Sequence, residues 1–99
     1  MMRVIPTLIS LVAVATWTVT VRADDAPAGA SSCSGCHPRS ARATTPVPSL
    51  AGRKAVDIEA EMAAFKSGAR PSTIMSRLAK GFSEQEISAI AAWYEKQRR

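Results

Sequence analysis

Hydrophobic and polar positions change their spacing several times along the chain. Residues 4–21 are free of charge and mostly apolar, whereas residues 38–49 are rich in Pro, Thr, Ser and Arg and have no apolar period. Residues 53–66 and the stretch after Ser83 instead repeat apolar side chains at the spacing of an amphipathic helix. The pattern predicts an all-α fold with a loop over residues 38–49.

The helix after Ser83 has the clearest start signal. Ser83 and Glu86 have the spacing of a capping box, and apolar residues recur beyond them at Ile87, Ile90, Ala91 and Tyr94. Trp93 and Tyr94 are expected either to fill the core or to pack against the segment that carries the two cysteines.

An earlier helix is expected from about Arg53 to Lys66, with Gly68 as its C-cap and Pro71 beyond its end. Its apolar face consists of Ala55, Ile58, Met62 and Phe65. A short helical turn is expected after Met75, ending at Gly81. The lead-in to the first cysteine, residues 24–32, contains Pro27 and Gly29 and should form at most a short helix.

The N-terminus resembles an export signal. Arg3 supplies the positive charge, the apolar stretch follows, and Val21-Arg22-Ala23 offers a cleavage point. We therefore expect a signal peptide over residues 1–23, a single domain over residues 24–99 and a periplasmic location. An uncleaved membrane anchor is the alternative, because the apolar stretch approaches the length of a membrane span.

The net charge of the chain limits the kinds of molecule expected to bind it. The chain has 13 basic and 8 acidic residues, and without Arg3 and Arg22 the formal charge is +3. The basic residues are scattered and lack the interleaved aromatic residues of a base-stacking surface, so nucleic acid is not expected as a partner. An acidic redox protein fits better, and a membrane surface is expected only if the N-terminal segment is retained. Any of Lys54, Lys66, Arg70, Arg77 and Lys80 could steer such a partner, although each is by default a solvated surface residue.

Two cysteines and one histidine, Cys33, Cys36 and His37, account for all residues of these types and lie within five positions. On one helical turn their side chains would project from one face. Two thiols at this spacing can add to the two vinyl groups of a haem while the imidazole binds its iron, so the motif predicts one covalent haem c.

Three alternatives fit this motif less well. A redox dithiol expects a βαβ setting, yet no strand-like alternation appears near the motif. Structural zinc needs four ligands. A disulfide between Cys33 and Cys36 would close a very short loop and stabilise the chain little.

A six-coordinate iron needs a second axial ligand, and the single histidine is already used. Met1 and Met2 belong to the signal segment, and Met62 lies on a helix face where methionine usually fills the core. Met75 follows Pro71 in a less regular stretch and is the expected ligand. A ligating imidazole normally donates its other N–H to a carbonyl group, and Pro48 is the expected acceptor.

Together the haem motif, Pro48-Ser49-Leu50-Ala51-Gly52, Ser72-Thr73-Ile74-Met75 and the final helix resemble a class I cytochrome c. The run from Phe65 to Ser83 is similar to the haem subunit of flavocytochrome c sulfide dehydrogenase and to single halves of diheme c-four cytochromes. The resemblance implies a small helical fold around one haem, with Cys33, Cys36, His37, Met75 and Pro48 at matching positions. It also implies electron transfer, with a flavoprotein as the partner in the sulfide dehydrogenase case.

The sequence is therefore compatible with three functions. The first is one-electron transfer by a non-enzymatic carrier or by the electron-transfer subunit of an oxidoreductase. The second is a haem enzyme or gas sensor, which requires an open sixth coordination position. The third is a thiol protein without haem.

Overall fold

The computed structural model describes residues 15–20, 25–40 and 42–98. In this part of the chain four helices follow one another: α1 (Ala30–Cys33), α2 (Ala55–Ser67), α3 (Met75–Ala79) and α4 (Glu84–Glu95). The described residues contain no strand, which confirms the predicted all-α class. Most of the expected signal segment, residues 1–23, lies outside the described residues and stays a prediction. Among the residues described, no helix is both long and apolar enough to cross a membrane.

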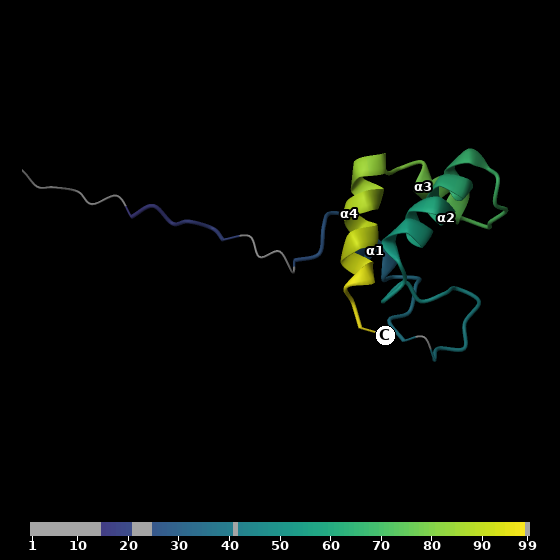
Figure 1. Cartoon of the computed structure of the whole chain (residues 1–99), viewed down its shortest axis with the longest axis horizontal. Coiled ribbons are helices and arrows are strands. Elements are labelled where there is room, and N and C mark those ends of the chain that lie inside the picture. Colours follow the sequence, from purple (N-terminus) through teal and green to yellow (C-terminus); the bar gives the residue numbers. More distant parts are fainter. Residues whose placement is uncertain (1–14, 21–24, 41, 99) are drawn as a thin grey trace, which may run out of the picture.

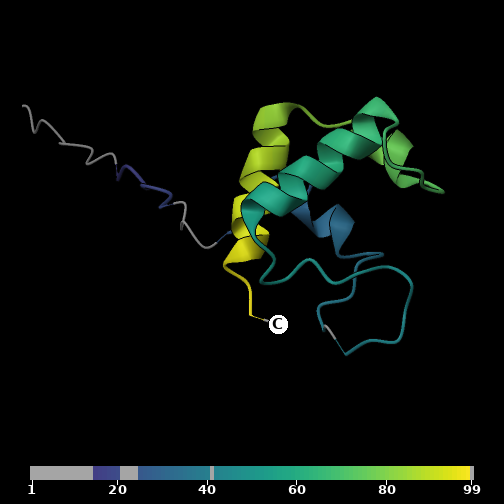
Figure 2. The same cartoon turned by 45° about the vertical axis from the view of Figure 1, so that its right-hand side comes forward.

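Helix α2 is the central element of the arrangement, because it packs against both α3 and α4. Figures 1 and 2 show α2 crossing α4, with α1 close to the crossing and α3 beside the C-terminal half of α2. The long connection between α1 and α2 lies at the end of the molecule where α4 finishes. As predicted, residues 38–40 and 42–49 in this connection form no helix.

The core is small and is built at the contact of α1, α2 and α4. Its main cluster of buried residues consists of Ala30, Ile58, Ile90, Ala91 and Tyr94. Of the eight buried hydrophobic residues in the described chain, four are alanine, so little apolar area is removed from water. Met62 is partly buried against this cluster, which confirms its expected role as a core filler.

Helix ends follow the local signals closely. Ser83 Oγ accepts from the Glu86 amide at 3.1 Å, and the Glu86 carboxylate accepts from the Ser83 amide at 2.7 Å, so the capping box is confirmed. Gly68 adopts φ 81° as the C-cap of α2, also as expected. Helix α2 begins at Ala55 rather than near Arg53, because Lys54 is extended and serves as its N-cap.

Candidate functional site

The two cysteines and the histidine occupy one turn at the end of α1. The helix itself ends at Cys33, and the Cys36 and His37 amides both donate to the Cys33 carbonyl, at 3.2 and 2.9 Å. The expected single helical turn is thus a short helix continued by a turn, since Gly35 and Pro38 disfavour helical geometry beyond Cys33.

Both cysteines carry free thiols, that of Cys33 partly buried and that of Cys36 exposed. Burial raises the pKa of the Cys33 thiol, which therefore keeps its proton at neutral pH. Within the described residues, no three His, Cys, Asp or Glu side chains are placed to hold a metal ion.

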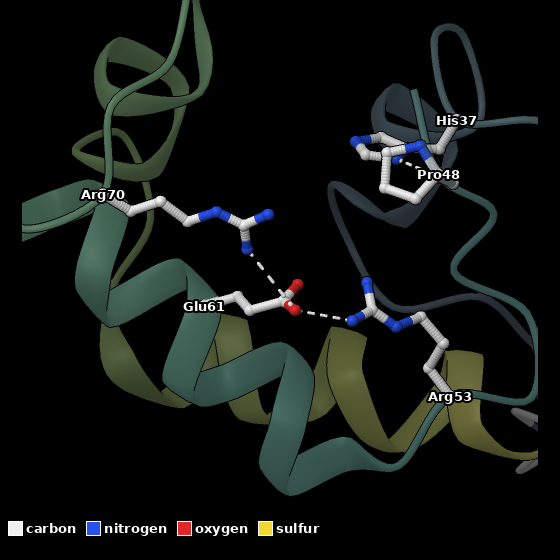
Figure 3. Close-up of polar contacts among 5 residues, drawn as sticks. All are labelled: His37, Pro48, Arg53, Glu61 and Arg70. Carbon is white, nitrogen blue, oxygen red and sulfur yellow. Dashed lines mark hydrogen bonds and ion pairs between the residues drawn. The ribbon is translucent and has the colours of Figure 1, made fainter. Parts of the chain in front are cut away.

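The imidazole of His37 has one of its two nitrogens occupied. Its Nδ1 lies 2.6 Å from the carbonyl oxygen of Pro48, and Figure 3 shows the two residues facing each other across the loop. A carbonyl oxygen can only accept, so Nδ1 carries a proton, and in the neutral imidazole Nε2 keeps its lone pair. The contact expected between these residues is present, and its role toward an iron ion stays a prediction.

A charged cluster that the sequence analysis did not identify lies near this pair. The Glu61 carboxylate is 2.6 Å from the Arg53 guanidinium and 3.4 Å from that of Arg70, and Figure 3 shows it between them. Burial alone would raise the pKa of Glu61, but the two arginines outweigh burial and lower it. The cluster keeps one positive charge in excess. No local pattern reveals it, because its members come from a loop, from α2 and from the segment after α2.

Arg53 also lines a polar cavity of about 320 Å³ formed mainly by the loop of residues 40–49. Pro48 belongs to the same lining, so the cavity adjoins the acceptor of the His37 hydrogen bond. Ser40, Thr45 and Ser49 contribute hydroxyl groups to it.

Met75, the expected second axial ligand, is the first residue of α3 and is partly buried. Its apolar neighbours Ile74 and Leu78 are 53% and 45% exposed, which leaves an apolar surface around it. Figures 1 and 2 place α3 apart from α1, so Met75 and His37 lie on separate elements. The structure thus brings Cys33, Cys36, His37 and Pro48 together and leaves Met75 on a different helix.

Of the basic residues considered as surface groups, two have partners. Lys66 donates to the Phe82 carbonyl at 2.5 Å, and Arg70 both pairs with Glu61 and lies 4.9 Å over the Phe65 ring. The other three, Lys54, Arg77 and Lys80, are exposed.

Tyr94 of α4 contacts the cysteine segment directly. Its hydroxyl donates to the Ala30 carbonyl at 2.8 Å and lies 2.9 Å from Ser34 Oγ. Burial raises the pKa of Tyr94, so the hydroxyl keeps its proton at neutral pH. Trp93 lies edge-on to the same ring, with the centroids 4.9 Å apart. Tyr94 has both of the roles considered for this aromatic pair, because it belongs to the buried core cluster and also contacts the cysteine segment.

Comparison with known proteins gives two relatives, while no protein-family profile matches the chain. The cytochrome subunit of sulfide dehydrogenase from Chlorobaculum tepidum is 40% identical over 63 residues, which are 64% of this chain and 57% of that protein. Cytochrome c-554(548) from Halomonas halodenitrificans is 33% identical over 82 residues, 76% of this chain and 99% of that protein. The chain therefore spans nearly the whole of the second relative and little more than half of the first.

Proposed function

This chain belongs to the class I c-type cytochromes, and from that premise we propose that it transfers single electrons through one haem c held by Cys33, Cys36, His37 and Met75. Electron transfer with haem c is the function of such cytochromes. The observation that carries His37 as the proposed iron ligand is the 2.6 Å hydrogen bond between its Nδ1 and the Pro48 carbonyl. In the neutral imidazole this bond leaves the Nε2 lone pair available on the turn that carries two free thiols.

The residues around this turn fit a haem. Two thiols match two vinyl groups, and the excess positive charge of Arg53 and Arg70 over Glu61 suits a cofactor with carboxylates. Ile74 and Leu78 present apolar surface that a porphyrin would cover. The core is small and rich in alanine, so the domain would gain stability from an additional apolar body such as a haem.

Each residue has a distinct part in holding the cofactor. The thiols of Cys33 and Cys36 would each add across a vinyl group, with sulfur bonding to one carbon and the proton passing to the other, so no oxidant or reductant is needed. His37 would bind iron through Nε2, and Met75 would supply the other protein ligand to the iron. When bound, the haem supplies a one-electron couple between ferric and ferrous iron. The Pro48 carbonyl fixes the tautomer and orientation of His37.

We further propose that residues 1–23 are a signal peptide and that residues 24–99 act in the periplasm. The cytochrome subunit of sulfide dehydrogenase is a relative, which supports a role as the haem subunit of a similar enzyme, with a flavoprotein as electron donor. Purification from the native host tests this: haem and flavin absorbance should elute together. Elution of the haem alone, with no flavoprotein bound at any salt concentration, would leave a diffusing carrier.

The ligand set is tested by absorption spectra of the exported wild type, of Met75→Ala and of Met62→Ala as the matched methionine control. We expect wild type and Met62→Ala to show a low-spin spectrum with a ferric sulfur-to-iron band and no reaction with carbon monoxide. Met75→Ala should lose the band and bind carbon monoxide in the ferrous state.

Two results would contradict the proposal in different ways. A wild type that binds carbon monoxide readily has an open coordination position, and an enzyme or gas sensor becomes the better account. A colourless protein, exported with haem-attachment machinery present, would exclude the cytochrome function altogether.

A further inference from the structure

Three polar groups from two distant segments form a directed chain of hydrogen bonds. The Tyr94 hydroxyl donates to the Ala30 carbonyl and lies 2.9 Å from Ser34 Oγ. A tyrosine hydroxyl has one proton and uses it here on Ala30, so Ser34 must donate to the Tyr94 oxygen. The direction runs from Ser34 through Tyr94 to Ala30.

Ala30 and Ser34 are the two ends of the segment that bears Cys33. Ala30 is the first residue of α1, and Ser34 follows its last residue. The Tyr94 hydroxyl bonds to the Ala30 carbonyl and to the Ser34 side chain, and so ties both ends of this short helix to α4. A four-residue helix has little stability of its own, so this tertiary contact supplies what helix propagation cannot.

The backbone of Tyr94 holds the opposite side of the site. Its carbonyl accepts from the Gly52 amide at 2.9 Å, and Gly52 lies four residues after Pro48, the acceptor for His37. One residue of α4 thus fixes both the turn that carries the imidazole and the segment that orients it. Because the two contacts use different atoms, replacing the side chain removes only the first.

We propose that Tyr94 and Ser34 are positioning residues that hold the Cys33–His37 turn, and with it the His37 imidazole plane, in one orientation toward the haem. The inference rests on the proposed haem ligation. Loss of the Tyr94 hydroxyl frees the Ala30 carbonyl and the Ser34 side chain, whereas loss of the Ser34 hydroxyl removes only the bond from Ser34 to Tyr94. Either loss lets the turn open more often and allows the imidazole to rotate.

The test uses the exported haem protein with Tyr94→Phe, Ser34→Ala, the double variant and Ser88→Ala. Phenylalanine keeps the ring that packs against Trp93. Ser88→Ala is the matched control, since it removes a hydroxyl of the same helix that bonds to Glu59 at 3.3 Å. Two readouts report on the turn: the haem-methyl NMR shifts of the ferric form, which depend on the imidazole plane, and amide hydrogen exchange at Cys36 and His37.

We expect Tyr94→Phe and Ser34→Ala both to shift the haem-methyl resonances and to speed exchange of the two turn amides about two- to tenfold, as for loss of one hydrogen bond. The double variant should change little beyond Tyr94→Phe, because both hydroxyls act in one chain. Ser88→Ala should match the wild type.

Unchanged methyl shifts and turn exchange in Tyr94→Phe, with only the global stability lowered, would overturn the inference and leave Tyr94 as a core residue. If Tyr94→Phe does not fold, Ser34→Ala provides the test, because Ser34 is exposed. Wild-type methyl shifts and wild-type turn exchange in Ser34→Ala would likewise overturn the inference. A wild type without haem would overturn the proposed function instead, and its missing haem resonances make that result distinct.

Discussion

The Glu61 carboxylate pairs with guanidinium groups from two segments, and its negative charge therefore contributes to the stability of the fold. Because its pKa is lowered in the native state, its contribution to stability is present above the unfolded pKa and is lost as pH falls through the native value. The side chain is 32% exposed, so solvent screens the pair and the contribution at neutral pH should be only about 0.2 to 1 kcal/mol.

Glu61→Gln should accordingly destabilise the haem protein at about pH 7, and the difference from the wild type should disappear below the lowered native pKa of Glu61, where both carry a neutral group at this position. Urea unfolding at about pH 7 and at a pH below that native pKa measures the difference. Glu59→Gln is the control, because Glu59 accepts from the Ser88 hydroxyl and has no arginine partner among its described contacts. An equal loss at both pH values would show that packing, not charge, is what Glu61 contributes.

At the scale of elements, the packing of the N-terminal end of α1 against Phe82 and α4 depends on Gly29. This residue has φ 89°, and an added Cβ would lie 2.6 Å from Phe82 Cε1. Gly68, at φ 81°, has open space where its Cβ would be. Comparing the two glycines therefore separates the cost of left-handed backbone strain from the cost of a close contact with Phe82.

Gly68→Ala should lose about 1 to 2 kcal/mol of unfolding free energy through left-handed strain alone. Gly29→Ala should lose more, by roughly a further 1 to 3 kcal/mol, because the Phe82 ring must move. Chemical denaturation of both variants gives the comparison. Equal losses would mean that Phe82 shifts without cost and that α1 docks loosely.

Local sequence was sufficient for the elements and for the placement of Cys33, Cys36 and His37 on one turn. The capping box at Ser83, the glycine end of α2 and the haem motif all act within a few residues, where spacing determines geometry. The Arg53–Glu61–Arg70 cluster and the Tyr94 contacts could not be read in this way. They depend on how α2 and α4 cross, which no single stretch of sequence specifies.

For the molecule as a whole, the small core predicts dependence on the cofactor. Ile74 and Leu78 are each about half exposed, and covering them would contribute about 1.5 to 3 kcal/mol. The double variant Cys33→Ser, Cys36→Ser should therefore show weaker helical circular dichroism and no sharp thermal transition after non-covalent haem is removed. A cooperative transition at the wild-type temperature would show that the helices pack without haem.

Ser34 and Tyr94 share a hydrogen bond but lie 60 residues apart in the sequence. The ribosome therefore makes Tyr94 some time after Ser34. A chain made at roughly 5 to 20 residues per second needs about 3 to 12 seconds to pass from one of these residues to the other. Throughout that interval Cys33 and Cys36 have been synthesised and α4 has not. The Cys33–His37 turn is therefore without its Tyr94 contact until α4 has been made.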